Sequence, residues 1–426
     1  MNILHTVQYY HPSVGGAQEV VRQVSEQLTL RGHTVTVATS FHPERSVFEL
    51  NGVHIEQFNI SGNAVQGFRG EVERYQDFLR HGNFDLMMNY AAQQWATDLV
   101  FPILGQIPYK KVLIPCGFSA LYDPAYTSYF AGMPAVMRGY DHLIFHADRY
   151  RDTDFARQHG LTRWSIIPNG ASRAEFEAAD PTFRQRYHIP ADEPLMLTVG
   201  SHTGVKGHAL VLEAFRRLKT ERATLVIIGN ADGRAHWWSG FIRPVLGSIK
   251  RGRFSEAAGQ VFDAALGGIG PAGCLSVCRA RARWMNWLGG GKKKVFLIDP
   301  PRAEVVGAYH AADLFVFGSN IEYSPLVLFE ALASRTPFIS LACGNAAEIA
   351  AWSGGGIVAP TIQKDQGFVD GNPTVLAQIV DDLLGDTVRR HALAEKGYHS
   401  WLERFTWEKL AKEYETLYFS LLRSGK

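Results

Sequence analysis

Apolar segments and helical repeats alternate along the first forty residues in the order strand, helix, strand. Asn2–Val7 is a mostly apolar segment that predicts a buried strand. A helix is expected next, because apolar residues recur at helical spacing until Gly32, at Val20, Val21, Val24 and Leu28. Thr34–Thr39 predicts the second strand. This βαβ unit indicates a parallel, Rossmann-like sheet with both faces covered.

The same pattern starts again after Ile166–Gly170 and the polar, acidic stretch 171–182. We expect strands at Leu195–Val199, Thr224–Ile228, Leu314–Phe317 and Pro337–Leu341, with helices at Gly207–Leu218 and Arg302–Ala312. The predicted fold class is therefore α/β, with two Rossmann-like, doubly wound domains facing a central cleft, at 1–172 and 173–406. The segment 407–426 has helical spacing of apolar residues and is expected to pack back on the N-terminal domain.

Length and composition agree with two domains. The chain has 426 residues, of which 46% are hydrophobic, about twice what a single core supports. Lys plus Arg number 43 and Asp plus Glu number 41, so no chain-wide basic field indicates nucleic acid as a partner. The first residues lack a basic leader, and no apolar stretch of 18 residues occurs. A cytoplasmic location is expected.

The four cysteines are too few for a disulfide framework, which favours a reducing compartment. Cys274 and Cys278 are four residues apart, but the sequence near them lacks the second pair of ligands that a zinc site needs. No metal site is predicted.

The most informative segment runs from Gly318 to Leu332. Ser324 is expected to cap a helix whose first residue is Pro325, which leaves the backbone N–H groups of Leu326 and Val327 free. A helix start of this kind binds an anion, typically a phosphate.

Two carboxylates bracket this helix start. Glu322 lies before it and Glu330 follows on the second turn, so both can accept hydrogen bonds from sugar hydroxyls. Glu322 and Glu330, with seven residues between them, resemble the E-x7-E motif of retaining family 4 glycosyltransferases of the GT-B fold. The resemblance covers nearly the whole chain, and its other matching segments are Gly15-Gly16, Pro168-Asn169-Gly170, Lys206-Gly207, Ala333–Pro337 and Gly344–Ile349.

This resemblance implies a function for each site residue. Glu322 would hold the donor sugar and Lys206 would contact the leaving diphosphate, so these two are the predicted catalytic residues. Glu330 would bind the ribose of the nucleotide. The remaining donor-binding set comprises Gly15, Gly16, Ser201, His202, Asn230, Ile298, Ser324, Pro325, Leu326 and Val327. Ser201 stands where the family usually has Arg, and His202 is the expected substitute for that phosphate contact.

The sequence says less about which residues bind the acceptor. Many family members have a His after a mid-domain strand, where this chain has Pro115, Cys116 and Gly117. We therefore assign no catalytic His to this chain from the resemblance. The residues that could contact an acceptor are Cys116, Gly117, Ser119 and Tyr122, and the favoured alternative is that they are ordinary loop residues.

No cofactor or metal is expected to assist the transfer. The helix start at Leu326, the loop Gly15-Gly16 and Lys206 would supply the positive potential that a departing diphosphate requires. Two competing motifs are rejected. Gly268–Gly273 fits G-x-G-x-x-G but follows no clear strand, and Asp152-Thr153-Asp154 fits D-x-D but lies in a polar helical stretch.

The segment 234–294 is longer than the resemblance leads one to expect and carries eleven basic but only two acidic residues. It also contains Trp237, Trp238, Phe241, Trp284 and Trp287. Basic residues interleaved with Trp suit an anionic membrane surface. RNA binding and a solvated insertion without a partner are the alternatives.

Together these observations predict a retaining, metal-independent hexosyltransferase-type enzyme. It would move a sugar from a nucleotide diphosphate sugar to the hydroxyl of a sugar or lipid-linked acceptor, in polysaccharide or glycolipid assembly. A peripheral position at the inner face of the membrane would follow from 234–294. The alternatives are a nucleotide-sugar epimerase or hydrolase of the same fold, and a non-catalytic sugar-nucleotide or membrane-binding protein.

Overall fold

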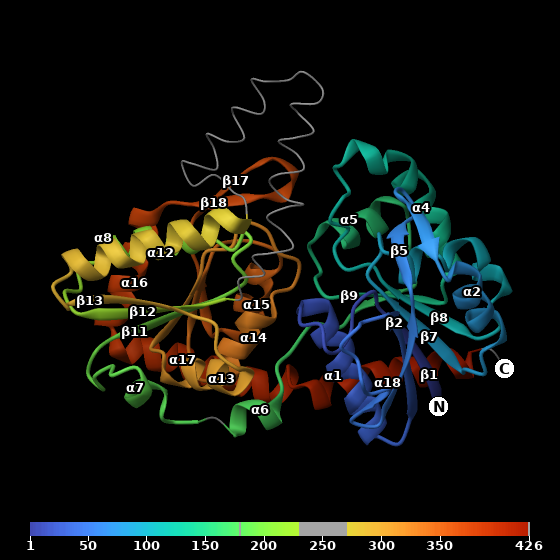
Figure 1. Ribbon diagram of the computed structural model, residues 1–426, viewed down its shortest axis with the longest axis horizontal. Coiled ribbons are helices and arrows are strands. Elements are labelled where there is room, and N and C mark those ends of the chain that lie inside the picture. Colours follow the sequence, from blue (N-terminus) through green and yellow to red (C-terminus); the bar gives the residue numbers. More distant parts are fainter. Residues whose placement is uncertain (179, 230–270, 425–426) are drawn as a thin grey trace. The chain divides into compact units, whose positions relative to one another are not determined.

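The chain folds into two compact units (Figure 1). The computed structural model describes residues 1–178, 180–229 and 271–424. Unit 1 comprises Met1–Ser172, Tyr323–Leu326 and Glu403–Lys426, and unit 2 comprises Arg173–Glu322 and Val327–Leu402. The chain therefore enters unit 1 for four residues, directly after Glu322.

Unit 1 is built on an eight-stranded sheet of order β10-β9-β8-β7-β1-β2-β4-β3, which is parallel except for the pairing of β3 with β4. Its strands are β1 (Asn2–Thr6), β2 (Thr34–Ser40), β3 (Glu49–Leu50), β4 (Val53–Phe58), β7 (Leu86–Tyr90), β8 (Lys110–Ile114), β9 (His142–Phe145) and β10 (Trp164–Ile166). A separate antiparallel pair consists of β5 (Ile60–Asn63) and β6 (Gly67–Gly70). The strand order reverses between β1 and β7.

Helices cover both faces of this sheet because consecutive strand residues point to opposite sides. Ile3 belongs to one apolar cluster and Leu4 to the other, and Met88 and Met87 divide in the same way. The helical segments of unit 1 are α1 (Gly16–Leu30), α2 (Val72–His81), α3 (Trp95–Asp98), η1 (Phe101–Gln106), η2 (Pro124–Tyr126), α4 (Thr127–Gly139), α5 (Arg151–Gln158) and α18 (Trp407–Arg423).

The C-terminal helix α18 is part of the core of unit 1. It lies beside α1 (Figure 1), and Leu410, Tyr414 and Tyr418 are wholly buried in the cluster that includes Ile3. A polar contact at the edge adds to this packing, because His33 Nε2 lies 2.9 Å from Glu415 Oε1.

Unit 2 contains a six-stranded parallel sheet of order β13-β12-β11-β14-β15-β16. Its strands are β11 (Leu195–Val199), β12 (Ala223–Ile228), β13 (Lys293–Ile298), β14 (Leu314–Phe317), β15 (Phe338–Ser340) and β16 (Gly356–Val358). Numbered in chain order within the unit, this is 3-2-1-4-5-6, the order of doubly wound nucleotide-binding domains. A small antiparallel pair, β17 (Thr361–Gln363) and β18 (Val369–Gly371), lies outside this sheet.

The helices of unit 2 surround the sheet. They are α6 (Arg173–Glu177), α7 (Phe183–Arg186), α8 (His208–Arg217), α12 (Pro271–Leu288), α13 (Arg302–Ala311), α14 (Leu326–Ala333), α15 (Ala346–Ser353), η4 (Asp365–Gly367), α16 (Pro373–Gly385) and α17 (Thr387–Arg404). Helix α12 packs beside α8 and β13. Within the described ranges, no helix combines the length and apolar character needed to cross a bilayer.

The predicted fold class is confirmed, since each unit holds a mostly parallel, doubly wound sheet. The strands expected at Leu195–Val199 and Leu314–Phe317 have these bounds in the structure. The insertion at 234–294 is described only from residue 271 onward, so its basic and aromatic residues between 234 and 253 lie outside the described residues.

Burial of α18 leads to a stability prediction. Leu410→Ala should lower the free energy of unfolding by about 2–5 kcal/mol, because it leaves a cavity in the core beneath α1. Tyr414→Phe is the matched control. The Tyr414 hydroxyl is buried without a hydrogen-bond partner within residues 1–178, 180–229 and 271–424, so its loss should be neutral or stabilising. Urea unfolding of both variants checks this, and equal midpoints for Leu410→Ala and wild type would contradict the docking of α18.

Candidate functional site

The loops after β11 and β14 lie at the point where the strand order of unit 2 reverses. Ligands of doubly wound sheets bind at this point, at the carboxyl ends of the strands. The two loops are hydrogen-bonded to each other, because Asn320 N donates to Val205 O at 2.8 Å, and Ser319 Oγ lies 3.1 Å from the same oxygen. Gly207 permits this close approach. Its φ is +68°, and a Cβ there would lie 1.8 Å from Gly318 O.

This approach brings the predicted catalytic residues together. Lys206 Nζ lies 2.6 Å from Glu322 Oε1, and Ser319 Oγ donates to the same carboxylate oxygen at 2.8 Å. The Lys206 side chain is 26% exposed and that of Glu322 is 13% exposed. A half-buried ammonium and a largely buried carboxylate therefore share the rim where a ligand would bind.

Glu330 is held by a different cation. Arg302 Nη2 lies 2.7 Å from Glu330 Oε1 and 2.9 Å from Glu175 Oε2. Glu330 is only 7% exposed, and Tyr309 beside it is wholly buried. Arg302 thus fixes one oxygen of the carboxylate that the sequence assigns to the ribose.

Helix α14 begins at Leu326, one residue later than predicted. Ser324 was expected to cap it, but the Ser324 hydroxyl is buried and has no hydrogen-bond partner among the residues that the structure describes. The Ser324 carbonyl instead accepts a hydrogen bond from Asn169 Nδ2 at 3.0 Å, which holds this residue outside the helix. Pro325 therefore precedes the helix, while the N–H groups of Leu326 and Val327 belong to its first turn, as expected.

The other predicted donor-binding residues occupy different environments. Ser201 is half-buried in the loop after β11, and Ile298 ends β13. His202 is 5% exposed, and its Nδ1 lies 3.8 Å from Cys274 Sγ on α12. Asn230 lies outside the described residues.

In unit 1, Gly15 and Gly16 occupy the loop after β1, again where the strand order reverses. Helix α1 begins at Gly16, so its first backbone N–H groups can bind an anion. A Cβ built on Gly16 would meet no atom within 4 Å, which leaves room for a ligand against the backbone.

The predicted acceptor loop is a strained turn. Cys116, Gly117 and Phe118 follow one another with φ values of 61°, 85° and 48°. Gly117 is required here, because a Cβ would lie 2.9 Å from the Tyr323 ring. The wholly buried Asp152 fixes the turn by accepting a hydrogen bond from Gly117 N at 2.8 Å.

Asp152 and Tyr323 form a buried polar network that the sequence analysis missed. Burial raises the pKa of Asp152 to about 6, although hydrogen bonds with Tyr323 and Gly117 favour its ionised form. Tyr323 Oη also accepts a hydrogen bond from His146 N at 2.9 Å. The sequence had singled out Asp152 only in a rejected D-x-D motif. Its helical spacing with Phe155 and Ala156 is the signal for its burial, whereas nothing near Tyr323 in the sequence indicates its partners.

The remaining acceptor-side residues differ in accessibility. Burial raises the pKa of the Cys116 thiol to about 12, so this thiol stays protonated near neutral pH. Ser119 Oγ donates to Gln93 Oε1 at 3.3 Å, and Tyr122 is 51% exposed with the Arg151 guanidinium over its ring. Of these residues, Ser119 and Tyr122 could reach an acceptor, and Cys116 shapes the turn.

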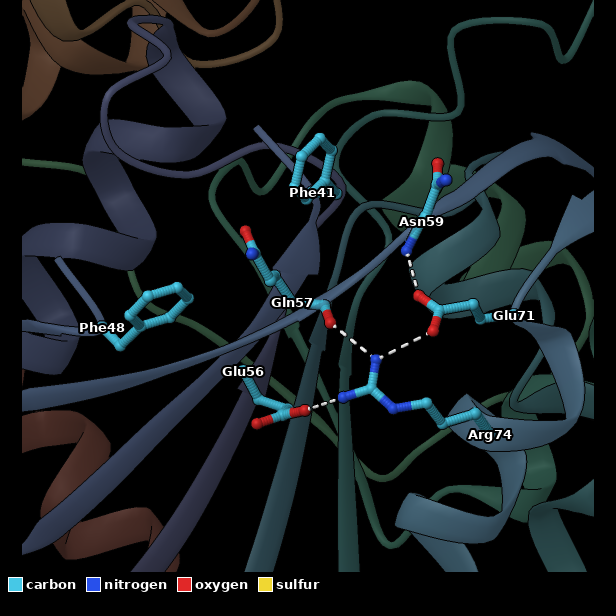
Figure 2. A pocket seen from close by; sticks show the side chains of 7 residues that line it. All are labelled: Phe41, Phe48, Glu56, Gln57, Asn59, Glu71 and Arg74. Atoms are coloured by element: carbon cyan, nitrogen blue, oxygen red, sulfur yellow. Dashed lines mark hydrogen bonds and ion pairs between the residues drawn. The ribbon is translucent and has the colours of Figure 1, made fainter. Parts of the chain in front are cut away.

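A hollow of about 330 Å³ lies elsewhere on unit 1 (Figure 2). Its lining comprises Phe41, Phe48, Glu56, Gln57, Asn59, Glu71 and Arg74. Figure 2 shows the Arg74 guanidinium bonded to Glu56, to Glu71 and to the Gln57 carbonyl. Because its positive charge is already paired and no predicted site residue lines the hollow, we assign it no part in donor binding.

The chain is similar to known glycosyltransferases in sequence and in fold. Residues 284–400, most of them in unit 2, match the family model described as Glycosyl transferases group 1. The D-inositol 3-phosphate glycosyltransferase of Xylanimonas cellulosilytica is 25% identical over 333 residues, which cover 75% of this chain and 66% of that protein. The lipopolysaccharide 1,2-N-acetylglucosaminetransferase of Salmonella typhimurium is 26% identical, over 59% of this chain and 55% of that protein. The matches thus span less than two thirds of each relative.

Solved structures show the fold. The structure of Anabaena HepE in complex with UDP superimposes with a TM-score of 0.69 at 15% identity, covering 99% of this chain and all of HepE. The fold is therefore GT-B, with two Rossmann-like units.

The raised pKa of Asp152 predicts a pH-dependent stability. An unfolded aspartate has a pKa of about 3.9, so the folded state binds more protons and wild type loses stability as pH rises through 6. Between pH 5 and 8 this loss should be about 1 kcal/mol, and Asp152→Asn should lack it. Urea unfolding across this range measures it, with the exposed Asp154→Asn on the same helix as control. Equal pH slopes for Asp152→Asn and wild type would contradict the assignment.

Proposed function

We propose that this protein is a retaining glycosyltransferase that moves a sugar from a nucleotide diphosphate sugar to an acceptor hydroxyl. The observation that carries this proposal is the pair formed by Lys206 and Glu322, 2.6 Å apart, where the strand order of unit 2 reverses. The match of residues 284–400 to the group 1 glycosyltransferase model supports it. Retention of configuration rests on the resemblance of Glu322 and Glu330 to the E-x7-E motif.

Each group of this site has a distinct chemical task. Lys206 would stabilise the negative charge that develops on the departing diphosphate, aided by the first N–H groups of α14. Glu322, held by Lys206 and Ser319, would accept hydrogen bonds from the hydroxyls of the donor sugar. Glu330, oriented by Arg302, would bind the ribose. These groups supply the required positive potential, so transfer is proposed to proceed without Mg²⁺ or Mn²⁺.

The comparisons suggest where to look for substrates. HepE was solved with UDP, which makes uridine diphosphate sugars the first donors to test. The two curated relatives are named for transfer to an inositol phosphate and in lipopolysaccharide, which supports a polar sugar or a glycolipid as acceptor.

The experiment combines nucleotide binding with turnover. UDP, GDP, ADP and their sugars are screened by thermal shift, because a ligand that binds the folded state raises its stability. With the donor found, Glu322→Gln should lower kcat by roughly 30- to 150-fold, equivalent to about 2–3 kcal/mol, while Glu330→Gln should mainly weaken nucleotide binding. The reactions contain EDTA and no added metal.

The matched control is Glu213→Gln, which removes an ion-paired surface carboxylate of the same unit on α8. It should behave as wild type. Wild-type kinetics for both site variants would overturn the site assignment. Release of free sugar without an acceptor would favour a hydrolase, and donor binding without turnover would favour a non-catalytic protein.

We further propose that the outer face of α12 contacts an anionic membrane. Arg279, Arg281 and Arg283 are exposed on this helix, and Trp284 and Trp287 are 51% and 78% exposed. Exposed Trp next to Arg suits the interface of an anionic bilayer. This would bring the enzyme to a lipid-linked acceptor.

The three lysines at 292–294 do not belong to this face. Lys293 Nζ donates to Leu218 O at 2.7 Å and to Arg216 O at 3.2 Å, at the end of α8. Lys292 pairs with Glu221 at 3.0 Å, and Lys294 lies 4.0 Å from Glu193. All three lysines thus lie near polar partners in unit 2, and their attraction to an anionic surface stays a prediction.

Membrane binding can be tested on α12 itself. Wild type should float with phosphatidylglycerol vesicles at low salt and be released at high salt, since each basic residue near the surface adds about 1 kcal/mol. Trp284→Ala with Trp287→Ala should abolish flotation. The control replaces Ile362 and Val388, which are exposed apolar residues elsewhere in unit 2, with Ser. Equal flotation of all three proteins would exclude α12 as the docking face.

A further inference from the structure

Three potential metal ligands converge at the inner side of α12. They are His202 in the loop after β11, and Cys274 and Cys278 on the helix. Their ligand atoms all lie within 4.8 Å of one another, and Nδ1 of His202 is 3.8 Å from Sγ of Cys274. Cys278 is 1% exposed and His202 is 5% exposed, so two of the three ligands are buried, and Cys274 is half-buried.

The 3.8 Å between His202 Nδ1 and Cys274 Sγ fits two ligands of one tetrahedral ion. With Zn–S of about 2.3 Å and Zn–N of about 2.1 Å, tetrahedral ligand atoms lie about 3.6–3.8 Å apart. Cys274 and Cys278 are one helical turn apart and therefore present their sulfurs on the same face. Two thiolates and an imidazole are ligands that zinc prefers, in an arrangement that leaves a fourth position for water.

His208 is the second observation that supports a ligand here. This histidine is 1% exposed, and its ring lies 4.7 Å from that of His202. Its Nε2–H donates to Gly200 O at 2.9 Å, which leaves Nδ1 with a lone pair. That Nδ1 is buried without a hydrogen-bond partner in the described part of the chain. A water bound to a metal at the cluster would donate a hydrogen bond to it.

We propose that His202, Cys274 and Cys278 bind one zinc ion, with water as the fourth ligand and His208 as the acceptor for that water. The ion attaches α12 to the loop that carries Lys206, four residues beyond His202. None of its ligands is one of the proposed reacting groups, Lys206 and Glu322, and we assign the ion a structural task. His202 is then a metal ligand and not a phosphate contact. The proposal holds whether or not the chain transfers sugar.

The test is metal content of the full-length protein, produced with zinc in the medium and dialysed against metal-free buffer. Wild type should contain one zinc per chain by mass spectrometry, and Co²⁺ substitution should give a thiolate-to-cobalt charge-transfer band. Cys274→Ser and His202→Gln should each reduce zinc to background and abolish that band. His208→Phe should weaken zinc affinity roughly 10- to 100-fold, as loss of a group outside the ligand set typically does.

Cys343→Ala is the matched control, since Cys343 is also a buried, free cysteine of unit 2. It should retain one zinc. Cys274 is only half-buried, so its serine variant is expected to fold, and circular dichroism checks this. Wild type without zinc and without a cobalt band would overturn the proposal, as would a Cys274–Cys278 disulfide detected by thiol titration or unchanged zinc in Cys274→Ser.

Discussion

The pairing of β11 with β14 is the constraint on which the proposed active site of unit 2 depends. These strands are adjacent in the sheet although more than a hundred residues separate them, and the chain winds in opposite directions on either side of them. The loops that follow both strands must therefore leave the sheet side by side. Their hydrogen bonds through Val205 and the close approach at Gly207 place Lys206 against Glu322. Desolvating two charges this close together costs free energy. An ion pair of this kind at a partly exposed rim can therefore exchange its internal contact for a contact with a ligand.

A second constraint is the way the loop after β14 continues. Glu322 belongs to unit 2, whereas Tyr323–Leu326 belong to unit 1, where Tyr323 contacts the turn at Gly117 and the buried Asp152. The glutamate proposed to hold the donor sugar is thus followed immediately by a tyrosine fixed in the other unit. The strained turn at 116–118 is retained because the Asp152 hydrogen bond and the packing of Phe118 hold it.

Helix α12 shows how one element can serve two surfaces. Its inner side places Cys278 and Met285 against unit 2, and its outer side exposes three arginines and two tryptophans. The solvent-facing side of an amphipathic helix usually carries charged and polar residues and few large aromatic ones. The exposed tryptophans of α12 therefore indicate a surface that binds a partner. An ion bound between α12 and the loop after β11 would keep the helix in register with the site while its outer face contacts a surface.

The sequence by itself determined the α/β class, the helices and strands on either side of residue 172, and the GT-B fold. The class and the elements follow from local hydrophobic periodicity, which depends on neighbours in the chain, whereas the GT-B fold is what the resemblance of the motifs to a known family implied. The sequence also selected Lys206, Glu322 and Glu330, since a motif of fixed spacing identifies residues before their contacts are known. Only the tertiary structure decided that Arg302 pairs with Glu330, that Asp152 and Tyr323 hold the acceptor turn, and that Lys292–Lys294 are paired. The tertiary structure also places His202 beside Cys274 and Cys278. From the sequence, these two cysteines lacked the additional ligands that a zinc site needs. Each of these contacts joins residues far apart in the chain. Such contacts are set by strand order and packing, so no repeating pattern in the sequence indicates them.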